Sequence, residues 1–238
     1  MMHDVIELRD FYATPLGQLV RRQLSKRIRA RWPSVRGDTV VGLGYATPYL
    51  AGYRREAAHI AALMPAGQGA LVWPRKGGGL SVLAEEDKLP LADASVDKLL
   101  AVHCLEGAER VRPLLREIWR VLTPQGSLVM IVANRRGLWA RIDTTPFGQG
   151  RPYSRRQLDK LLEESMLTPV DWSSALYMPP FGHRLVIRSA NALERVGARL
   201  TPAFAGVVVV EAKKEIMALV GKTTRARVVG ELVEQPQR

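Results

Sequence analysis

A glycine turn between an apolar run and a helix start constrains the fold of this chain more than any other stretch. The apolar run 40–43 contains Gly42 and ends at Gly44, and Thr47-Pro48 follows. Threonine is a favoured N-cap and proline is favoured in the first turn, so this pair predicts a helix start. A strand, a glycine turn and a helix in this order direct backbone N–H groups and the positive helix end toward a ligand. A tight strand-to-helix turn that binds no ligand explains the same residues equally well. The choice between the two interpretations depends on the rest of the sequence.

Length and composition favour one α/β domain with extensions. The chain has 238 residues, of which 47% are apolar, enough for a buried core. A membrane-spanning helix needs about 18 or more consecutive apolar residues, and no such run occurs. Asp4 and Glu7 stand where a signal peptide would be basic, which favours a cytoplasmic location. Cys104 is the only cysteine, which excludes an internal disulfide and a cysteine-rich zinc site.

The balance of charge is strongly basic, with a formal net charge of +12. Such a balance favours nucleic acid, acidic proteins or anionic lipid headgroups as partners. The basic residues are spread along the whole chain and form no tract. The charge therefore leaves nucleic-acid binding and a protein partner open.

Residues 1–36 are expected to form a helical extension before the first strand. Apolar residues recur at helical spacing from Leu16 to Arg31, which predicts an amphipathic helix. The simplest interpretation is a surface helix that packs on the domain. The alternative is a lid or a basic partner-binding helix, with Tyr12 facing a site just before it.

The rest of the chain alternates between strand and helix patterns, which predicts a parallel sheet with right-handed crossovers. From 214 to 238 the pattern weakens, and this tail is expected to be partly disordered. We expect helices over 47–64, 109–122 and 154–164, and strands over 39–44, 70–73, 80–83, 98–105, 127–132, 168–177 and 206–212.

Four segments in this order resemble the class I S-adenosylmethionine-dependent methyltransferases, of the broad type 11 group. They are Val40–Leu50, Glu85–Asp97 with its Leu-Pro-Leu and Asp-Ala-Ser-Val-Asp, His103–Glu106, and Leu115–Gly126. The last is similar to the family's L-x-E-x-x-R-V-L-K-P-G-G run. The resemblance covers residues 37–213, which we expect to form one methyltransferase-like domain.

The resemblance implies a Rossmann-like sheet of seven strands whose last strand is antiparallel, with ligands at the carboxyl ends of the strands. It also implies S-adenosylmethionine as cofactor and methyl transfer to an unidentified acceptor, a small molecule or RNA. The glycine turn would approach the methionyl part, Glu85 would accept from the adenine amino group, and the residues after strand four would wall the pocket. The cofactor-binding residues implied are Gly42, Leu43, Gly44, Tyr45, Ala46, Glu85, Glu86, His103 and Leu105.

The sequence departs from the family at the predicted second strand. The family ends this strand with an acidic residue that binds the ribose, whereas here Trp73-Pro74 stands at that point, so Trp73 takes the cofactor-contacting position. The connection to the third strand is also too short for the usual helix. The departure supports an alternative, in which a degenerate relative without normal cofactor binding serves as a binding or scaffold partner.

Methyl transfer requires a positioned acceptor and, for some acceptors, removal of a proton. His103 is the candidate base because it ends a strand beside the expected cofactor; a buried histidine bonded to the backbone is the alternative. No metal-ligand spacing stands out. Candidate substrate-binding residues are Tyr12, Arg135, Arg136, Arg151 and Tyr153, although aromatic packing and a solvated basic loop also explain them.

Overall fold

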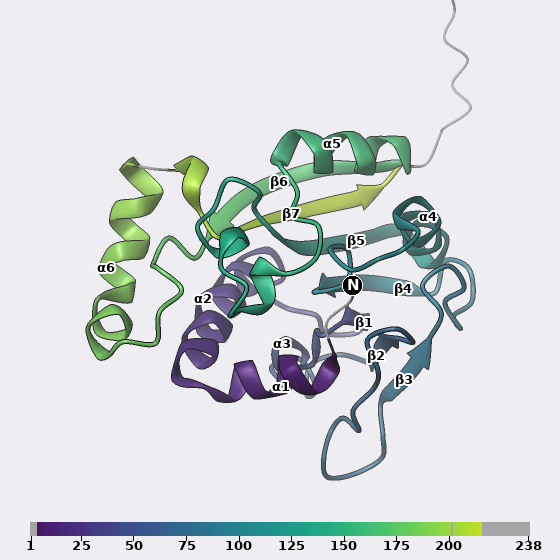
Figure 1. The fold of residues 1–238 in the computed structure, drawn as a ribbon. Coiled ribbons are helices and arrows are strands. Elements are labelled where there is room, and N and C mark those ends of the chain that lie inside the picture. Colours follow the sequence, from purple (N-terminus) through teal and green to yellow (C-terminus); the bar gives the residue numbers. More distant parts are fainter. Residues whose placement is uncertain (1–3, 201, 216–238) are drawn as a thin grey trace, which may run out of the picture.

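A computed structural model, which describes residues 4–200 and 202–215, contains one mixed sheet of seven strands. The spatial order is β3-β2-β1-β4-β5-β7-β6 (Figure 1). All neighbours pair in parallel except β7, which runs antiparallel to both β5 and β6. This confirms the predicted architecture. The strands are β1 (Thr39–Gly44), β2 (His59–Pro65), β3 (Ser81–Ala84), β4 (Val96–Val102), β5 (Leu122–Ala133), β6 (Leu167–Ala175) and β7 (Val207–Lys214).

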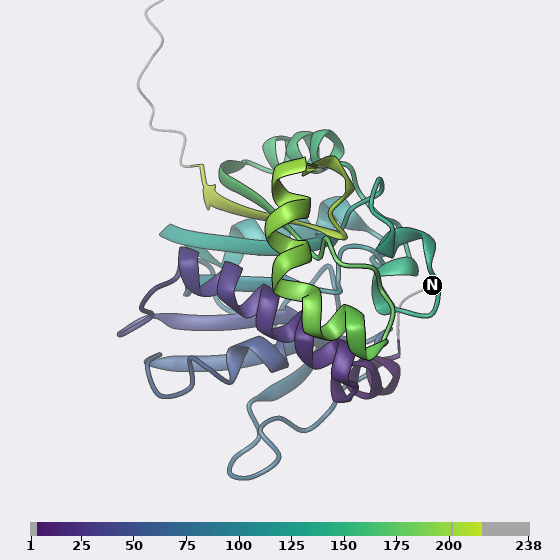
Figure 2. The same cartoon turned by 90° about the vertical axis from the view of Figure 1, so that its left-hand side faces the viewer.

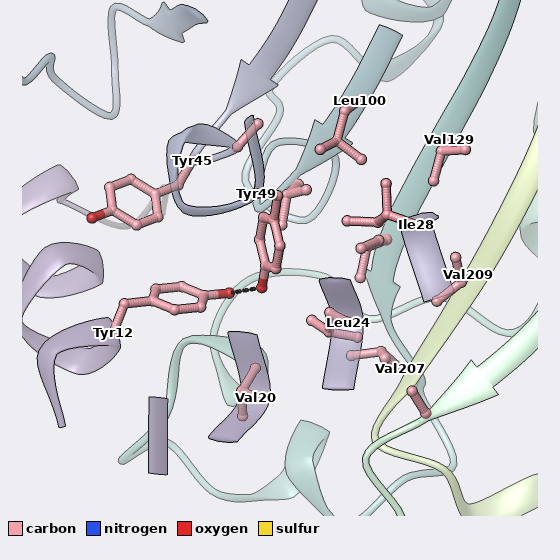
Figure 3. Close-up of a cluster of buried hydrophobic side chains, with 14 of the residues drawn as sticks. Tyr12, Val20, Leu24, Ile28, Tyr45, Tyr49, Leu100, Val129, Val207 and Val209 are labelled. Carbon is pink, nitrogen blue, oxygen red and sulfur yellow. Dashed lines mark hydrogen bonds between the residues drawn. The ribbon is translucent and has the colours of Figure 1, made fainter. Parts of the chain in front are cut away.

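Two apolar layers cover the two faces of the sheet, because successive strand residues point to opposite sides. Val40 contributes to the layer under the N-terminal helices, whereas Val41 contributes to the layer under α4 and α5. Figure 3 shows part of the first layer, with Leu24, Ile28 and Val129 among its side chains. The helices are α1 (Val5–Ala13), α2 (Pro15–Arg31), α3 (Thr47–Leu50), α4 (Val111–Val121), α5 (Arg155–Glu164) and α6 (Arg184–Leu200).

The predicted N-terminal helix is confirmed as α2, which lies across the sheet (Figure 2). Its apolar stripe is buried, and Trp32 at its C-cap is 1% exposed with its indole N–H donating to Ser127 Oγ at 3.1 Å. The sequence did not predict α1, which precedes α2 and crosses the carboxyl ends of the parallel strands. The extension is therefore packed on the sheet and on the edge where ligands are expected.

The predicted helix over 47–64 is wrong. Only one turn forms, α3, and the chain then turns back into β2, whose Ile60 pairs with Val40 of β1. The apolar run 60–65 of β2 is short enough for a buried strand, and periodicity alone does not distinguish such a run from a buried helix segment. Tertiary pairing beside β1 decides in favour of the strand.

The predicted strand over 70–73 is also wrong, since these residues lie in a loop. The connection from β2 to β3 spans 66–80 and holds no helix, as predicted, but it is longer than the predicted segment 73–80 because β2 ends at Pro65. Trp73 lies within this loop and its carbonyl accepts from Leu80 N–H at 2.7 Å. Trp73 therefore does not end strand two, and the argument that placed it against the cofactor loses its basis.

The second half of the chain follows the expected order closely. Ser154 and Gln157 form a reciprocal capping box at the start of α5, as the sequence pattern predicts. The expected disordered tail lies, except for Lys214 and Glu215, outside the described residues. Among the residues that the structure describes, no helix is long and apolar enough to cross a membrane.

Candidate functional site

The carboxyl ends of β1, β2, β3 and β4 meet at one edge of the sheet, which is where ligands bind in folds of this kind. Each strand is followed there by a polar or aromatic residue. The edge is covered by α1, whose first N–H, from Val5, donates to the carbonyl of Gln68 at 2.8 Å. The residues that follow the four strand ends are Tyr45, Gln68, Glu85, Glu86, His103 and Glu106.

The glycine turn at the end of β1 is fixed by close packing. Gly44 has φ +76°, and a Cβ added there would lie 2.3 Å from the carbonyl oxygen of Val102 on β4. A Cβ on Gly42 would lie 2.7 Å from that of Ala46. The N–H of Tyr45 donates to the same Val102 carbonyl at 2.8 Å. Glycine at both positions lets β1, its turn and the end of β4 come together.

Tyr12 of α1 inserts into the space above this turn, as Figure 3 shows for its hydroxyl, which points at Tyr49. The two hydroxyl oxygens are 2.7 Å apart, and the Tyr12 hydroxyl is also 2.9 Å from His103 Nε2. The ring of Tyr45 lies 5.5 Å from that of Tyr12. Burial raises the pKa of Tyr12 well above its usual value, so the hydroxyl keeps its proton. The N-terminal extension thus reaches the predicted base.

We predict that Tyr12→Phe destabilises the protein by about 2 kcal/mol, because the hydroxyl of Tyr49 and His103 Nε2 both lose a buried partner. Urea unfolding measures the change. Tyr153→Phe is the matched control, since its hydroxyl makes a weaker contact of 3.5 Å to the carbonyl of Leu105. Equal losses of unfolding free energy in the two variants would contradict a special contribution of the Tyr12 hydroxyl to stability.

His103 occupies a strained and enclosed position. Its φ is +52°, a left-handed conformation that non-glycine residues adopt mainly where surrounding contacts enforce it. Its carbonyl accepts from Gln68 Nε2 at 2.8 Å, and its ring centroid is 4.6 Å from that of Phe147. The side chain is 5% exposed. His103, directly after β4, therefore contacts α1, the loop after β2 and the segment after β5.

An acidic pocket of about 530 Å³ opens beside this junction, on the β3 side. The carboxyl group of Glu86 lines it and is half-buried, and burial raises its pKa. One oxygen of that carboxyl accepts from Glu109 N–H at 3.2 Å. Glu85, which the resemblance assigns to the adenine, and Glu86, which it counts among the cofactor-binding residues, thus both line a cavity. The lining residues are Ala66, Gly67, Glu85, Glu86, Asp87, Gly107, Glu109 and Arg110.

Three buried acceptor oxygens around this edge have no hydrogen-bond partner among the described residues. They are Oε1 of Gln68 after β2, Oε1 of Glu86 after β3 and Oε2 of Glu106 after β4. An unsatisfied buried polar atom costs free energy, so a group of them at one edge is expected to serve a ligand that donates hydrogen bonds. The strands that they follow flank β1 and its glycine turn on both sides.

Gln68 and Glu106 are site residues that the sequence interpretation missed. The sequence does not indicate Gln68 as a site residue, because its pattern predicts the end of strand two at Trp73 and not at Pro65. Glu106 closes the predicted motif after strand four, but nothing in the sequence indicates that its side chain turns inward. Its Oε1 accepts from Ala133 N–H at 2.8 Å, and complete burial raises the pKa of the carboxyl to about 7.

The structure brings part of the predicted substrate set to the same place. The N–H of Arg151 donates to the carbonyl of Glu106 at 2.8 Å, and Tyr153 contacts Leu105. Arg135 is exposed and donates its N–H to the carbonyl of Tyr153 at 3.1 Å. Arg136 lies apart from these, in a separate pocket of about 690 Å³ beside Trp172 and Arg155.

The comparisons with known proteins point to one fold. The methyltransferase domain family model matches residues 38–130, which include the glycine turn, the acidic pocket residues and His103. No curated protein matches this sequence.

Solved structures match over most of the chain. A Haloferax volcanii protein solved in complex with a methyltransferase activator is 20% identical, with 88% of this chain and 96% of that chain covered and a TM-score of 0.61. An S-adenosylmethionine-dependent methyltransferase from Thermotoga maritima is 16% identical, with coverages of 89% and 96% and a TM-score of 0.63. The 1,6-didemethyltoxoflavin-N1-methyltransferase of Burkholderia thailandensis, with its namesake ligand and S-adenosylhomocysteine bound, is 18% identical, with coverages of 81% and 76% and a TM-score of 0.51. At these identities the likeness shows the fold.

Proposed function

We propose that this protein, which carries a methyltransferase domain at residues 38–130 on the class I methyltransferase fold, transfers a methyl group from S-adenosylmethionine to a small-molecule acceptor. The observation that supports this most directly is the set of three buried, unpartnered acceptor oxygens on Gln68, Glu86 and Glu106 around the glycine turn. The cofactor offers matching donors for the oxygens of Gln68 and Glu86, namely ribose hydroxyls and an adenine amino group, and the free oxygen of Glu106 is left for the acceptor. The residues present therefore fit it.

Each strand end has a proposed role in holding the cofactor. The turn from Gly42 to Ala46 would face the methionyl part, and Glu85 with Glu86 would accept from the adenine amino group. Gln68 would take the place of the ribose-binding acid that follows strand two in the family, because its amide oxygen stands free after β2. When bound, S-adenosylmethionine supplies an activated methyl group on a sulfonium.

Two residues could take a proton from the acceptor. His103 is the candidate that the sequence indicates, but its Nε2 contacts the hydroxyl of Tyr12. Glu106 has an oxygen without a described partner, and its pKa of about 7 suits proton acceptance near neutral pH. We propose Glu106 as the proton acceptor, with His103 and Tyr12 as the wall that positions the acceptor.

A small-molecule acceptor follows from how enclosed this edge is. Tyr12 and His103 are 7% and 5% exposed, and Phe147 closes over His103 from the segment after β5. A polynucleotide needs an open surface at the reacting atom, whereas a small acceptor can enter as α1 moves. We propose that α1 acts as the lid over this site.

Calorimetric titration with S-adenosylmethionine and with S-adenosylhomocysteine tests the proposal. We expect saturable binding of both. Absence of binding at millimolar ligand would overturn it and would favour a binding or scaffold protein that has lost the cofactor.

We predict that Gln68→Ala raises the dissociation constant for S-adenosylhomocysteine about tenfold, the equivalent of one lost hydrogen bond of about 1.4 kcal/mol. Gln18→Ala on the exposed face of α2 is the matched control and should leave the affinity unchanged. Melting temperatures of both variants show whether the fold is retained. An unchanged affinity in folded Gln68→Ala would remove Gln68 from the cofactor site.

A further inference from the structure

Helix α6 presents an unusual outer face. Leu185, Val196 and Leu200 are 79%, 53% and 75% exposed. The opposite side of the helix packs into the core, where Ala190 is buried. Figure 2 shows α6 as the outermost element on its side of the molecule, in front of α2. Folded domains seldom leave several large aliphatic side chains on one helix in water without a function.

These aliphatic side chains form one stripe along the helix. At 3.6 residues per turn, the spacings of eleven and four residues that separate Leu185, Val196 and Leu200 return to nearly the same direction. Between Leu185 and Val196, the small residues Ser189 and Ala192 point in the same direction and are also exposed. The stripe therefore runs over most of the length of α6.

A row of arginines runs beside the stripe. All four arginines are exposed, and each comes one residue before a residue of the stripe, which places it about 100° to one side of the stripe. They are Arg184, Arg188, Arg195 and Arg199. The only acid on the helix is Glu194, which is buried and accepts from Tyr177 N–H at 2.6 Å. An apolar stripe edged by arginines is the pattern of helices that lie at a membrane surface.

The neighbouring helix adds charge of the same sign. Gln23 of α2 donates to Asn191 of α6 at 2.9 Å, so the two helices are in contact. Arg21, Arg22 and Lys26 of α2 are exposed, and α2 contains no acid. Both helices are on the side that faces the viewer in Figure 2.

We propose that the α6 face, defined as the exposed side chains of α6 together with Arg22 and Lys26 of α2, binds the surface of an anionic phospholipid bilayer. The arginine row meets the lipid phosphates, and the aliphatic stripe enters the boundary between headgroups and acyl chains. RNA would use the cations but would leave Leu185 and Leu200 without a partner. This binding is independent of the methyltransferase activity.

Sedimentation of the full chain with vesicles tests the proposal. We expect binding to phosphatidylcholine vesicles that contain phosphatidylglycerol, little binding to phosphatidylcholine alone, and weakening by salt. Leu185→Ser with Leu200→Ser should lower the partition coefficient at least about tenfold because the aliphatic contacts are lost. Arg188→Glu with Arg199→Glu should lower it at least about tenfold, since each basic residue near an anionic surface contributes about fivefold.

Variants on other surfaces provide the controls. Arg116→Glu with Arg156→Glu changes the net charge equally on α4 and α5, and Val82→Ser with Val170→Ser removes two aliphatic side chains that are about half exposed. Both controls should retain binding to within about twofold of the parent. If the double serine variant of α6 has a lower melting temperature than the parent, the single variant Leu185→Ala takes its place.

Three results would overturn the proposal. The first is no sedimentation of the parent protein with vesicles, and the second is an equal loss of vesicle binding in the control pairs. The third is binding that weakens with salt but is unchanged when Leu185 and Leu200 are replaced. The last would identify a phosphate-binding surface of the kind that RNA uses. Cofactor affinity, measured in the same preparations, separates this outcome from a failure of the proposed methyltransferase site.

Discussion

Replacing Gly44 with alanine is expected to destabilise the fold by about 3 kcal/mol or more. The added Cβ would stand 2.3 Å from the carbonyl oxygen of Val102 and 2.8 Å from the Cβ of Cys104. The first of these is a backbone atom, so no side chain can rotate away to make room. The φ of +76° adds about 1 to 2 kcal/mol, since L-residues are strained there.

Chemical denaturation of Gly44→Ala and Gly37→Ala separates the two causes. Gly37 has a φ of +85°, but a Cβ added there meets nothing within 4 Å. Gly37→Ala should therefore show only the conformational cost of about 1 kcal/mol. If both variants lose the same stability, the close contact between β1 and β4 does not matter and our account of the turn is incorrect.

Any folded fraction of Gly44→Ala should also bind S-adenosylhomocysteine more weakly than the parent. The clash pushes the end of β1 away from Val102 and Cys104, and His103 lies between these two, directly after β4. A shift there displaces the carbonyl that Gln68 contacts. Affinity equal to the parent would mean that the turn supports the fold without shaping the site.

Local signals made much of the fold predictable. The glycine turn, the helix of residues 15–31 and the capping box at Ser154 each depend on neighbours within a few residues. The four ordered segments then fixed the strand sequence from β3 onward and the antiparallel last strand. These elements were predicted because the short-range pattern and the long-range packing agree.

The region between β1 and β3 was not predictable in the same way. Residues 60–65 are uniformly apolar and are compatible with a buried helix as well as with a buried strand. Their pairing with β1, from Thr39 opposite His59 onward, is a contact between distant residues that no local pattern encodes. The error displaced the end of β2 from Pro65 to Trp73 and hid Gln68.

The candidate site shows the same division. Its positions after β1, β3 and β4 come from motif spacing, and the sequence placed them at one edge of the sheet. The contact between Tyr12 and His103 joins residues 91 positions apart, and the sequence offered only that Tyr12 stands before a helix. The free oxygens of Gln68, Glu86 and Glu106 depend on which neighbours fail to reach them, which is a property of the folded packing alone.

The pH dependence of stability should reveal Glu106. Burial raises the pKa of this carboxyl from 4.5 to about 7 in the folded protein. Between these values the folded state holds a proton that the unfolded state has released, so stability falls as the pH rises through this window. From about pH 5 to about pH 8 the loss due to Glu106 is expected to be about 2.5 kcal/mol.

Glu106→Gln removes this titration while keeping the acceptor for Ala133 N–H. We expect the variant to gain about 2.5 kcal/mol on the parent between about pH 5 and about pH 8, as measured by urea unfolding at each pH. Other buried acids, such as Glu86, titrate alike in both proteins and cancel in the difference. Glu163→Gln, at an exposed position of α5, is the control and should follow the stability of the parent at every pH. A pH-independent difference between Glu106→Gln and the parent would show that Glu106 is already ionised at neutral pH, and it would then have no proton-binding advantage in the proposed methyl transfer.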